Sequence, residues 1–258
     1  MTAERFHALH HGSAPLLLPN AWDQVTATAL LDAGFLAVGT TSLGVALAAG
    51  LPDAEGLARE ATLALARGLV RLPCPVSVDI EGGFSEDPAE VAALCAELAD
   101  LGVAGVNLED GRSGGTLVPV DRQERVLEAV RRAAPRLFLN ARTDTCWLGV
   151  EPESTSDRLR AYAGAGADGV FVPGLSGDAR IAEIVDAVDV PVNLLYRPGA
   201  GTVERLGELG VRRVSTGSLL FRASLGATVA TALAVRAGAE PPLTPPSYAE
   251  AQALIPGG

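Results

Sequence analysis

The chain has 258 residues, of which 48% are hydrophobic, and a formal net charge of -11 with a pI near 4.7. This length and apolar content can bury one large core, so we expect a single catalytic domain over residues 1–240. The acidic balance argues against nucleic acid or an anionic membrane as a partner, because either favours a basic surface. The first residues form no secretory signal, and no stretch of about 20 residues lacks polar breaks, so we expect a cytoplasmic protein.

Histidine and cysteine contribute little to the expected chemistry. His7, His10 and His11 precede the first predicted strand, and we expect them in a solvated first helix. The three cysteines cannot all pair and have no metal-ligand spacing, which predicts buried thiols. Cys146 alone lies near a predicted strand end, where a nucleophilic role is the alternative.

Short apolar runs recur along the chain, and each is followed by a stretch with helical spacing. They predict eight strands, over residues 15–18, 36–39, 76–79, 104–108, 137–140, 169–172, 190–194 and 211–215. The intervening stretches predict helices such as 87–101, 121–134 and 157–165, with Ser85, Asp121 and Ser156 as caps. Short connections imply parallel strands and right-handed crossovers, so eight units predict a closed (β/α)8 TIM-type barrel. No GxGxxG follows the first strand, which disfavours nucleotide binding.

A proline-rich segment follows the last long helical stretch. Residues 241–246 read Pro-Pro-Leu-Thr-Pro-Pro, and a short amphipathic stretch follows them. We interpret residues 241–258 as a C-terminal arm that packs on its own barrel or on a neighbouring subunit. A homodimer or homotetramer is therefore expected.

Polar residues close three of the predicted strands. The pairs are Asp79 with Glu81, Asn107 with Glu109, and Asn140 with Arg142. Alternate residues of a strand share a face, so the two members of each pair point the same way. Because active sites of this fold lie at the C-terminal ends of the strands, the three pairs are expected to converge there.

Carboxylates dominate this expected site. Asp79, Glu81, Glu109 and Asp53, which lies on the loop after the second strand, are oxygen ligands of the kind that magnesium prefers. Solvated caps or salt-bridge partners are the alternative, but unpaired buried carboxylates raise one another's pKa, and a divalent cation relieves that repulsion. The sequence therefore predicts a Mg2+ site that could also take Mn2+.

An anion pocket is expected beside the metal. Arg142 ends an apolar strand, where a guanidinium is costly to desolvate without an anionic partner. A substrate carboxylate or phosphonate is one partner, and an internal ion pair with Asp144 or Glu109 is the alternative. The small-residue turn from Thr41 to Gly44 offers backbone amides for an oxyanion.

These segments together resemble the isocitrate lyase and phosphoenolpyruvate mutase superfamily over nearly the whole chain. The matching segments are Pro19-Asn-Ala-Trp-Asp23, Thr40-Thr-Ser-Leu-Gly-Val-Ala46, Pro52-Asp53, Asp79-Ile-Glu-Gly-Gly83, Asn107-Leu-Glu-Asp110, Asn140-Ala-Arg-Thr-Asp144 and Gly210-Val-Arg-Arg-Val-Ser215. The resemblance implies a magnesium-dependent barrel that makes or breaks C-C or P-C bonds of small 2-oxo or 2-hydroxy acids through an enolate. It also implies subunits that exchange their last helix.

The resemblance also implies roles for individual residues. Asp79 matches a direct metal ligand, and Asp53, Glu81 and Glu109 match ligands that act through water. Substrate contacts are predicted from Thr41, Ser42, Leu43, Gly44, Trp22, Arg142 and Asn193, and catalytic roles from Arg142, Asn107 and Thr41.

The chain departs from the family's well-known reactions. Arg112-Ser-Gly-Gly-Thr-Leu-Val-Pro119 replaces the Lys-x-Cys-Gly-His segment of the lyases and also lacks the lysines of the phosphonate enzymes, and Asn107 stands where histidine often occurs. Decarboxylation of a β-keto acid such as oxaloacetate needs no general acid and is expected first. Cleavage of a substituted malate or citrate, with Tyr196 or a water as proton donor, comes next. Phosphonopyruvate chemistry and a catalytically silent metabolite-binding protein are the alternatives.

Overall fold

Nine short strands form one parallel sheet in the computed structural model, which describes residues 2–199 and 201–255. They are β1 (Leu16–Leu18), β2 (Asn20–Ala21), β3 (Val38–Thr40), β4 (Val76–Asp79), β5 (Gly105–Glu109), β8 (Phe138–Arg142), β9 (Gly169–Val172), β10 (Val192–Leu195) and β11 (Arg213–Ser215). Their order is β1-β11-β10-β9-β8-β5-β4-β3-β2, and every pair is parallel. All eight predicted strands are present, and the TIM-type barrel is confirmed.

The barrel closes through an N-terminal strand that is interrupted at Pro19. Its first part, β1, pairs with β11, and its second part, β2, pairs with β3, so the two edges of the sheet meet. Proline lacks the amide hydrogen of a continuous ladder, but its carbonyl still accepts from Gly39 N-H at 2.8 Å. Asn20 reinforces the closure, since its Oδ1 accepts from the amides of Thr216 and Gly217 while its Nδ2 donates to Thr40 O.

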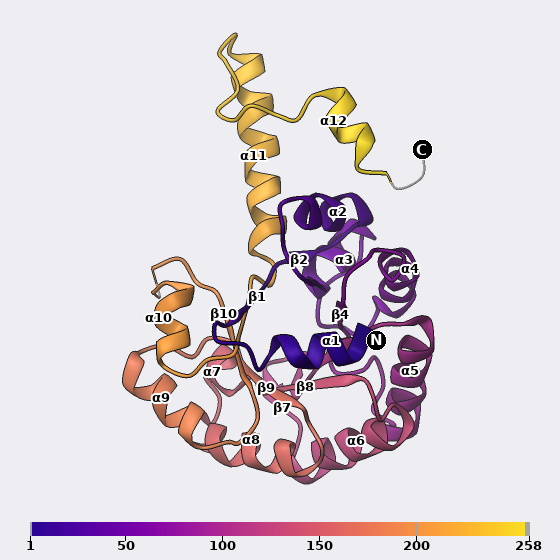
Figure 1. Cartoon of the computed structure of the whole chain (residues 1–258), viewed down its shortest axis with the longest axis vertical. Helices are drawn as coiled ribbons and strands as arrows, with labels where there is room; N and C mark the ends of the chain where they lie inside the picture. Colours follow the sequence, from indigo (N-terminus) through magenta and orange to yellow (C-terminus); the bar gives the residue numbers. More distant parts are fainter. Residues whose placement is uncertain (1, 200, 256–258) are drawn as a thin grey trace.

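Helices surround the barrel (Figure 1). They are α2 (Gln24–Asp32), α3 (Ser42–Ala48), α4 (Arg59–Leu69), α5 (Pro88–Leu101), α6 (Val120–Ala133), α7 (Thr145–Leu148), α8 (Thr155–Gly164), α9 (Asp178–Asp186) and α10 (Val203–Glu208), with a 3-10 turn at Pro152–Ser154. The three helices predicted by range are confirmed as α5, α6 and α8, within two residues at each end.

The predicted capping residues are wrong for all three helices. Asp87 caps α5 by accepting from Ala89 N-H, because Pro88 occupies the first helical position and sets the start of the helix. Ser85 instead donates to Glu90 Oε2. Helix α6 starts after Pro119 and α8 after Ser154, and neither cap residue makes a side-chain capping bond.

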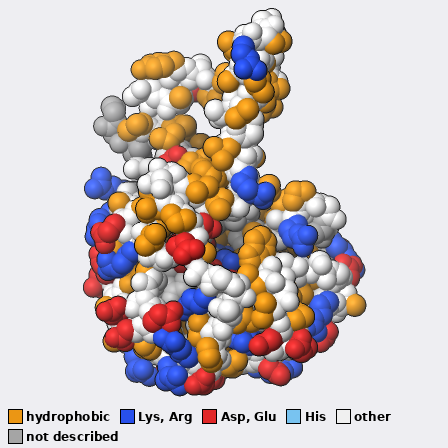
Figure 2. Space-filling view, turned by 180° about the vertical axis from the view of Figure 1, so that it is seen from behind, with side chains coloured by type: hydrophobic (Ala, Val, Ile, Leu, Met, Phe, Trp, Pro, Cys, Tyr) orange, Lys and Arg blue, Asp and Glu red, His pale blue; other side chains and the backbone are white. Residues whose placement is uncertain are grey.

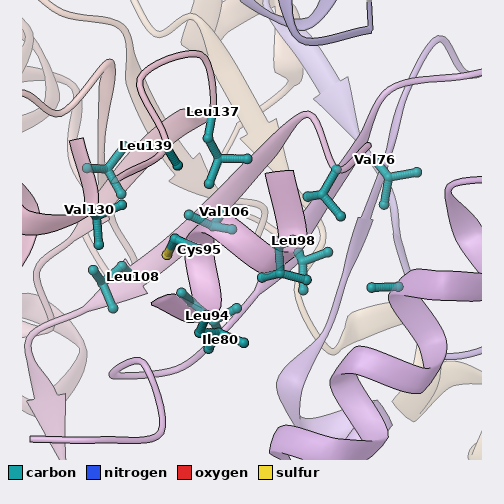
Figure 3. Packing of buried hydrophobic residues seen from close by; sticks show 14 of the residues in the cluster. Val76, Ile80, Leu94, Cys95, Leu98, Val106, Leu108, Val130, Leu137 and Leu139 are labelled. Carbon is teal, nitrogen blue, oxygen red and sulfur yellow. The ribbon is translucent and has the colours of Figure 1, made fainter. Parts of the chain in front are cut away.

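The largest core cluster joins helices α4, α5 and α6 to the strands beneath them. Figure 3 shows Leu94, Cys95 and Leu98 of α5 lying against Val106 of β5, with Leu139 of β8 and Val130 of α6 nearby. These side chains are at most 2% exposed. Burial of Cys95 raises the pKa of its thiol to about 12, so this cysteine packs as an apolar side chain.

Helix α1 (Thr2–Leu9) closes the N-terminal mouth of the barrel. Phe6 is fully buried and meets Phe138 edge to face, with ring centroids 5.4 Å apart. Gly105 makes room for it, since a Cβ there would lie 2.8 Å from the Phe6 ring. His10 stacks on Phe138 at 4.0 Å and donates from Nδ1 to Phe6 O at 2.8 Å.

The expectation that all three N-terminal histidines are solvated is therefore wrong for His10. Its side chain is 1% exposed, and burial, together with the charge of Arg213, lowers its pKa from 6.5 to about 3. The helical pattern did not show that α1 turns one face into the barrel.

Acid is expected to destabilise the fold through His10. Between pH 6.5 and about 3 the unfolded chain binds a proton here and the folded chain does not, so stability falls as pH decreases through this window. The loss is on the order of 1 kcal/mol for each pH unit. Urea unfolding at pH 7 and pH 5 should show a smaller loss for His10→Phe than for the control His11→Phe, and equal losses would contradict this assignment.

The C-terminal part projects from the barrel (Figure 1). Helix α11 (Leu219–Arg236) buries only Phe221, and α12 (Tyr248–Ala253) buries no residue. Figure 2 shows hydrophobic side chains over this projection, where Leu225, Val229 and Leu233 are about half exposed. Helix α11 is also long and apolar enough to cross a membrane, although length and composition alone are weak evidence for that. The division at residue 240 stays a prediction, and residues 256–258 of the predicted arm lie outside the described residues.

Candidate active site

A pocket of about 190 Å3 opens at the C-terminal ends of the strands. Eight of the residues predicted for the site line one side of it. They are Thr41, Ser42, Leu43, Asp53, Asp79, Asn107, Glu109 and Arg142. Its other wall is apolar, with Trp147, Leu148, Phe171, Pro173 and Leu195. The topology thus brings together side chains as far apart in the chain as Thr41 and Leu195.

Buried carboxylates crowd one side of the pocket. Burial raises the pKa of Asp79, and the charges of Asp53 and Asp144 add to this while Arg142 opposes it. Burial likewise raises the pKa of Glu109 to about 8, against the opposing charge of Arg142. Negative charge therefore exceeds what the neighbouring cation neutralises.

Glu81 points into a second pocket that adjoins the first. This pocket of about 250 Å3 shares Glu109 and Arg112 with its neighbour. Burial raises the pKa of Glu81 to about 7, although Gly56 N-H donates to its Oε2 at 3.1 Å. Its backbone has φ 51°, which is strained for a residue with a side chain and is typical of functional sites.

Arg142 makes the internal ion pairs that were the alternative for this residue. Its Nη1 lies 2.8 Å from Glu109 Oε2, and its Nε lies 2.6 Å from Asp144 Oδ1. The guanidinium also lies 5.6 Å from the centre of the Phe171 ring. The contacts of the guanidinium within residues 2–199 and 201–255 use Nε and Nη1, so Nη2 remains as a donor group for a substrate anion.

The fully buried carboxylate of Asp110 holds Asp144, an ion-pair partner of Arg142, in place. Asp110 accepts from Thr143 Oγ1 and from the Asp144 amide, each at 2.8 Å, and from Tyr162 Oη at 2.7 Å. Arg158 Nη1 donates to Asp110 at 3.3 Å and to Val118 O at 2.8 Å. This network ties β8 and α8 to the base of the neighbouring loop, which fixes Asp144 and through it Arg142.

The residues present fit a divalent cation. Asp53 Oδ1 and Glu81 Oε1 are buried oxygens without a hydrogen-bond partner in the described chain. Carboxylate oxygens are the ligands that Mg2+ takes, usually one or two directly and others through water. No group of three or more acidic, histidine or cysteine side chains in the described residues is arranged to hold an ion directly. Asp79 as the direct ligand, with Asp53, Glu81 and Glu109 through water, therefore stays a prediction.

Three predicted substrate contacts lie outside the lining of the main pocket. Trp22 packs edge to face on Phe221, with centroids 5.2 Å apart. Gly44 allows Trp22 to approach α3, because a Cβ there would lie 2.8 Å from Trp22 Cβ. Asn193 is buried inside the barrel, where its Oδ1 accepts from Ser215 Oγ at 3.4 Å.

Several residues that line the pocket were not predicted as metal ligands or substrate contacts, including Asp144, Arg112 and the apolar wall. The sequence indicated Asp144 only as an alternative ion-pair partner of Arg142, two residues away. Phe171 and Leu195 read as ordinary core residues, and no sequence pattern separates them from the core. They lie on β9 and β10, of which β9 pairs with β8 and β10 pairs with β9 in the barrel (Figure 1).

The Gly-Gly pair of residues 111–120 motivates the hypothesis that this segment closes over a substrate. In the structure, the segment contains a small hairpin. It comprises β6 (Gly111–Arg112) and β7 (Thr116–Leu117), with Gly114 and Gly115 in the left-handed region at its turn. Position 111 requires glycine, because the Cβ of any other residue would collide with the Asp144 carboxylate. Arg112 donates to Glu86 at 3.0 Å from this hairpin, and its movement over the substrate stays a hypothesis.

The fold and site define an α/β-barrel protein with a carboxylate cluster and an arginine at the mouth of the barrel. The family model described as phosphoenolpyruvate phosphomutase matches residues 6–236. The chain therefore belongs to the phosphoenolpyruvate mutase family, within the isocitrate lyase and phosphoenolpyruvate mutase superfamily, as the sequence resemblance predicted.

Relatives support this membership. An uncharacterized protein of Mycobacterium tuberculosis is 45% identical over 252 residues, covering 97% of this chain and 95% of that protein. The 2-methylisocitrate lyase of Bacillus subtilis (strain 168) is 31% identical over 201 residues, covering 74% and 65%. A crystal structure from Burkholderia cenocepacia J2315, described provisionally as a phosphonomutase, is 36% identical with a TM-score of 0.84, covering 90% and 98%.

Magnesium is expected to stabilise the folded protein through Asp79. At a concentration about 100 times the Kd, binding adds about 2.7 kcal/mol, or roughly 5–10 °C in Tm. Asp79→Ala should abolish this gain and leave the metal-free Tm unchanged or higher, since it removes a buried repulsive charge. Thermal unfolding with and without Mg2+ checks this, with exposed Asp100→Ala as the matched control; an undiminished Mg2+ effect in Asp79→Ala would refute the assignment.

Proposed function

We propose that the chain is a cytoplasmic, Mg2+-dependent enzyme that breaks or forms a C-C bond in a small 2-oxo or 2-hydroxy di- or tricarboxylic acid through an enolate. Decarboxylation of an oxaloacetate-type acid and cleavage of a substituted malate are its first candidate reactions. The observation that carries this proposal is the cluster of buried carboxylates with unpartnered oxygens beside Arg142, which uses Nε and Nη1 in ion pairs with Asp144 and Glu109. Such a site suits a cation and a substrate carboxylate together.

The relatives support the reaction class. The Bacillus subtilis relative is a C-C lyase by name, and the Burkholderia cenocepacia structure is described as a phosphonomutase. A phosphonopyruvate-type substrate is therefore the second candidate.

The side chains of the pocket have distinct proposed tasks. A bound divalent cation supplies Lewis-acid polarisation of a substrate carbonyl oxygen. Arg142 orients a substrate carboxylate through its free Nη2, while Glu109 and Asp144 hold the guanidinium plane. Thr41 starts α3 without a side-chain capping bond, so its hydroxyl can donate to the same carboxylate. Trp147, Phe171 and Leu195 form the apolar wall and exclude water from the reacting bond.

The available proton donors favour decarboxylation. All 20 basic residues of the chain are arginines, whose guanidinium groups do not act as acids near neutral pH. No histidine or cysteine is among the described residues that line the pocket. Tyr196, the donor considered for the lyase reaction, lines a different pocket with Leu175 and Arg197. Loss of CO2 leaves an enolate without needing a general acid at that step.

Turnover is expected from a defined panel of substrates. NMR should show one of oxaloacetate, 2-methylisocitrate, 2,3-dimethylmalate or phosphonopyruvate disappearing in the presence of Mg2+ and surviving with EDTA. Asp79→Ala and Arg142→Ala should each lower kcat/KM by about 100-fold or more, because the first removes the proposed ligand of the cation and the second removes the group that orients the substrate carboxylate.

The control for this panel is Asp100→Ala, which lies on an exposed face of α5 and should retain full turnover. Consumption of phosphonopyruvate alone would move the assignment to P-C chemistry. No turnover of any substrate, with Mg2+ still stabilising the protein, would favour a silent metabolite-binding protein and count against the enzyme.

We also propose that α11 packs against a second copy of the chain, as the family resemblance implies. Leu225, Val229 and Leu233 are spaced four residues apart and share one face, continuing from Phe221, which meets Trp22 of the barrel. A monomer would leave this stripe in water, which is unusual for an apolar patch of this length.

Sedimentation should therefore give a mass that is a multiple of 26.4 kDa. Val229→Glu is expected to shift the protein toward the monomer, because it places a charge in the buried stripe. Ala223→Glu, on another face of α11, is the matched control. A monomeric wild type, or a wild type that sediments with lipid vesicles, would contradict the proposed assembly.

A further inference from the structure

The carboxamide of Asn107 lies between the active site and the barrel interior. Asn107 is on β5, opposite Asp79 of β4 and Asn140 of β8 in the register of the sheet. Its side chain is 4% exposed and contributes to the pocket. Glu109 lies two residues further on the same face of the strand, so Asn107 stands directly below the carboxylate cluster.

Two donors reach the same atom of this carboxamide. Asn140 Nδ2 donates to Asn107 Oδ1 at 2.9 Å, and Arg213 Nη2 donates to it at 3.1 Å. A guanidinium can only donate, so the atom that faces Arg213 must be the carbonyl oxygen. The orientation of the amide is therefore fixed by chemistry. Its Nδ2 has no hydrogen-bond partner within residues 2–199 and 201–255.

Burial of the Arg213 guanidinium is energetically unfavourable. Arg213 is fully buried in β11, and its Nε and Nη1 have no hydrogen-bond partner in the described chain. Phe6 lies under its guanidinium at 5.9 Å, and burial lowers its pKa to about 9 despite the attraction of Asp79. A buried cation with unpaired donors destabilises the fold, and within the described residues the one side-chain hydrogen bond of Arg213 goes to Asn107.

We infer that Arg213 and Asn140 hold Asn107 so that its Nδ2 donates a hydrogen bond to an anionic oxygen of the substrate. Asn107 is thus a donor in the pocket, and Arg213 is a positioning residue that acts through it. Among the polar side chains on this side of the pocket, Asp79, Glu109 and Asp144 are carboxylates, so a neutral donor there stabilises negative charge that the acids would repel.

This inference rests on the proposed function for the identity of the ligand, since it requires an anionic oxygen in the pocket. Its test uses oxalate, a small dicarboxylate that resembles the enolate of a 2-oxo acid and needs no turnover. Failure to turn over any substrate would therefore leave this test interpretable.

The direct readout is the side-chain amide signal of Asn107. In 15N NMR spectra with Mg2+ present, one NH2 pair should be missing in Asn107→Asp, which assigns it. Oxalate should move that pair in the wild type and leave the pair of buried Gln123 in α6 unchanged. Binding of oxalate by calorimetry with no shift of the Asn107 pair would overturn the donor role.

Substitutions test whether Asn107 donates a hydrogen bond to oxalate or accepts one. Asn107→Asp keeps the oxygen for Arg213 and Asn140 but replaces the donor with an acceptor. Oxalate affinity should fall at least about tenfold, because a hydrogen bond to a charged acceptor is lost. Retained affinity would show that the pocket uses an acceptor here. Gln123→Glu, the same change at a buried amide away from the pocket, should leave oxalate affinity unchanged.

A double-mutant cycle tests the positioning role. Arg213→Met should lower oxalate affinity several-fold in the wild type, because only Asn140 then holds the Asn107 amide, and it should add little in the Asn107→Asp background. Arg213→Lys, which keeps a donor, should retain more affinity than Arg213→Met. Losses that add fully would overturn the positioning role. If Arg213→Met does not fold, the Lys variant and the amide signal decide the question.

Discussion

The excess of buried carboxylate over buried cation at the mouth of the barrel constrains the rest of the site. Asp53, Asp79, Glu81, Glu109 and Asp144 meet there around one contacting arginine. Burial is the main reason why the pKa values of Glu81 and Glu109 rise toward neutrality, and repulsion from the neighbouring carboxylates adds to it. A fold that retains such a cluster gains most when a divalent cation or a substrate donor compensates it.

The barrel supports this mouth with an interior that is more polar than an ordinary hydrocarbon core. Arg213 and the amides of Asn107 and Asn140 occupy a layer directly beneath the carboxylates. Below them, Phe6 of α1 and His10, just after this helix, seal the opposite end, where the His10 ring meets Phe6 edge to face and stacks on Phe138. Polar groups in this layer set the direction of side chains above them, which an aliphatic layer could not do.

The residues that stabilise the fold and those that line the pocket lie in different parts of the molecule. The aliphatic packing between α4, α5, α6 and the strands is remote from the pocket and tolerates the repulsion at the mouth. The Asp110 network joins the two regions, because it is fully buried yet fixes the partner of Arg142. The stripe of α11 belongs to neither region, because Leu225, Val229 and Leu233 are about half exposed in the single chain.

The sequence by itself determined the eight strands, the barrel and most of the acidic site, because alternation along a strand and the shared end of parallel strands place Asp79, Glu109 and Arg142 together. It also indicated the family through its motifs. Only the tertiary structure decided that Arg142 is paired with Glu109 and Asp144, that His10 is buried, and that Trp22 packs on Phe221 instead of lining the pocket. These outcomes depend on contacts between distant segments, and the direction of the Asn107 amide in particular is set by Arg213, 106 residues away, which no local pattern encodes.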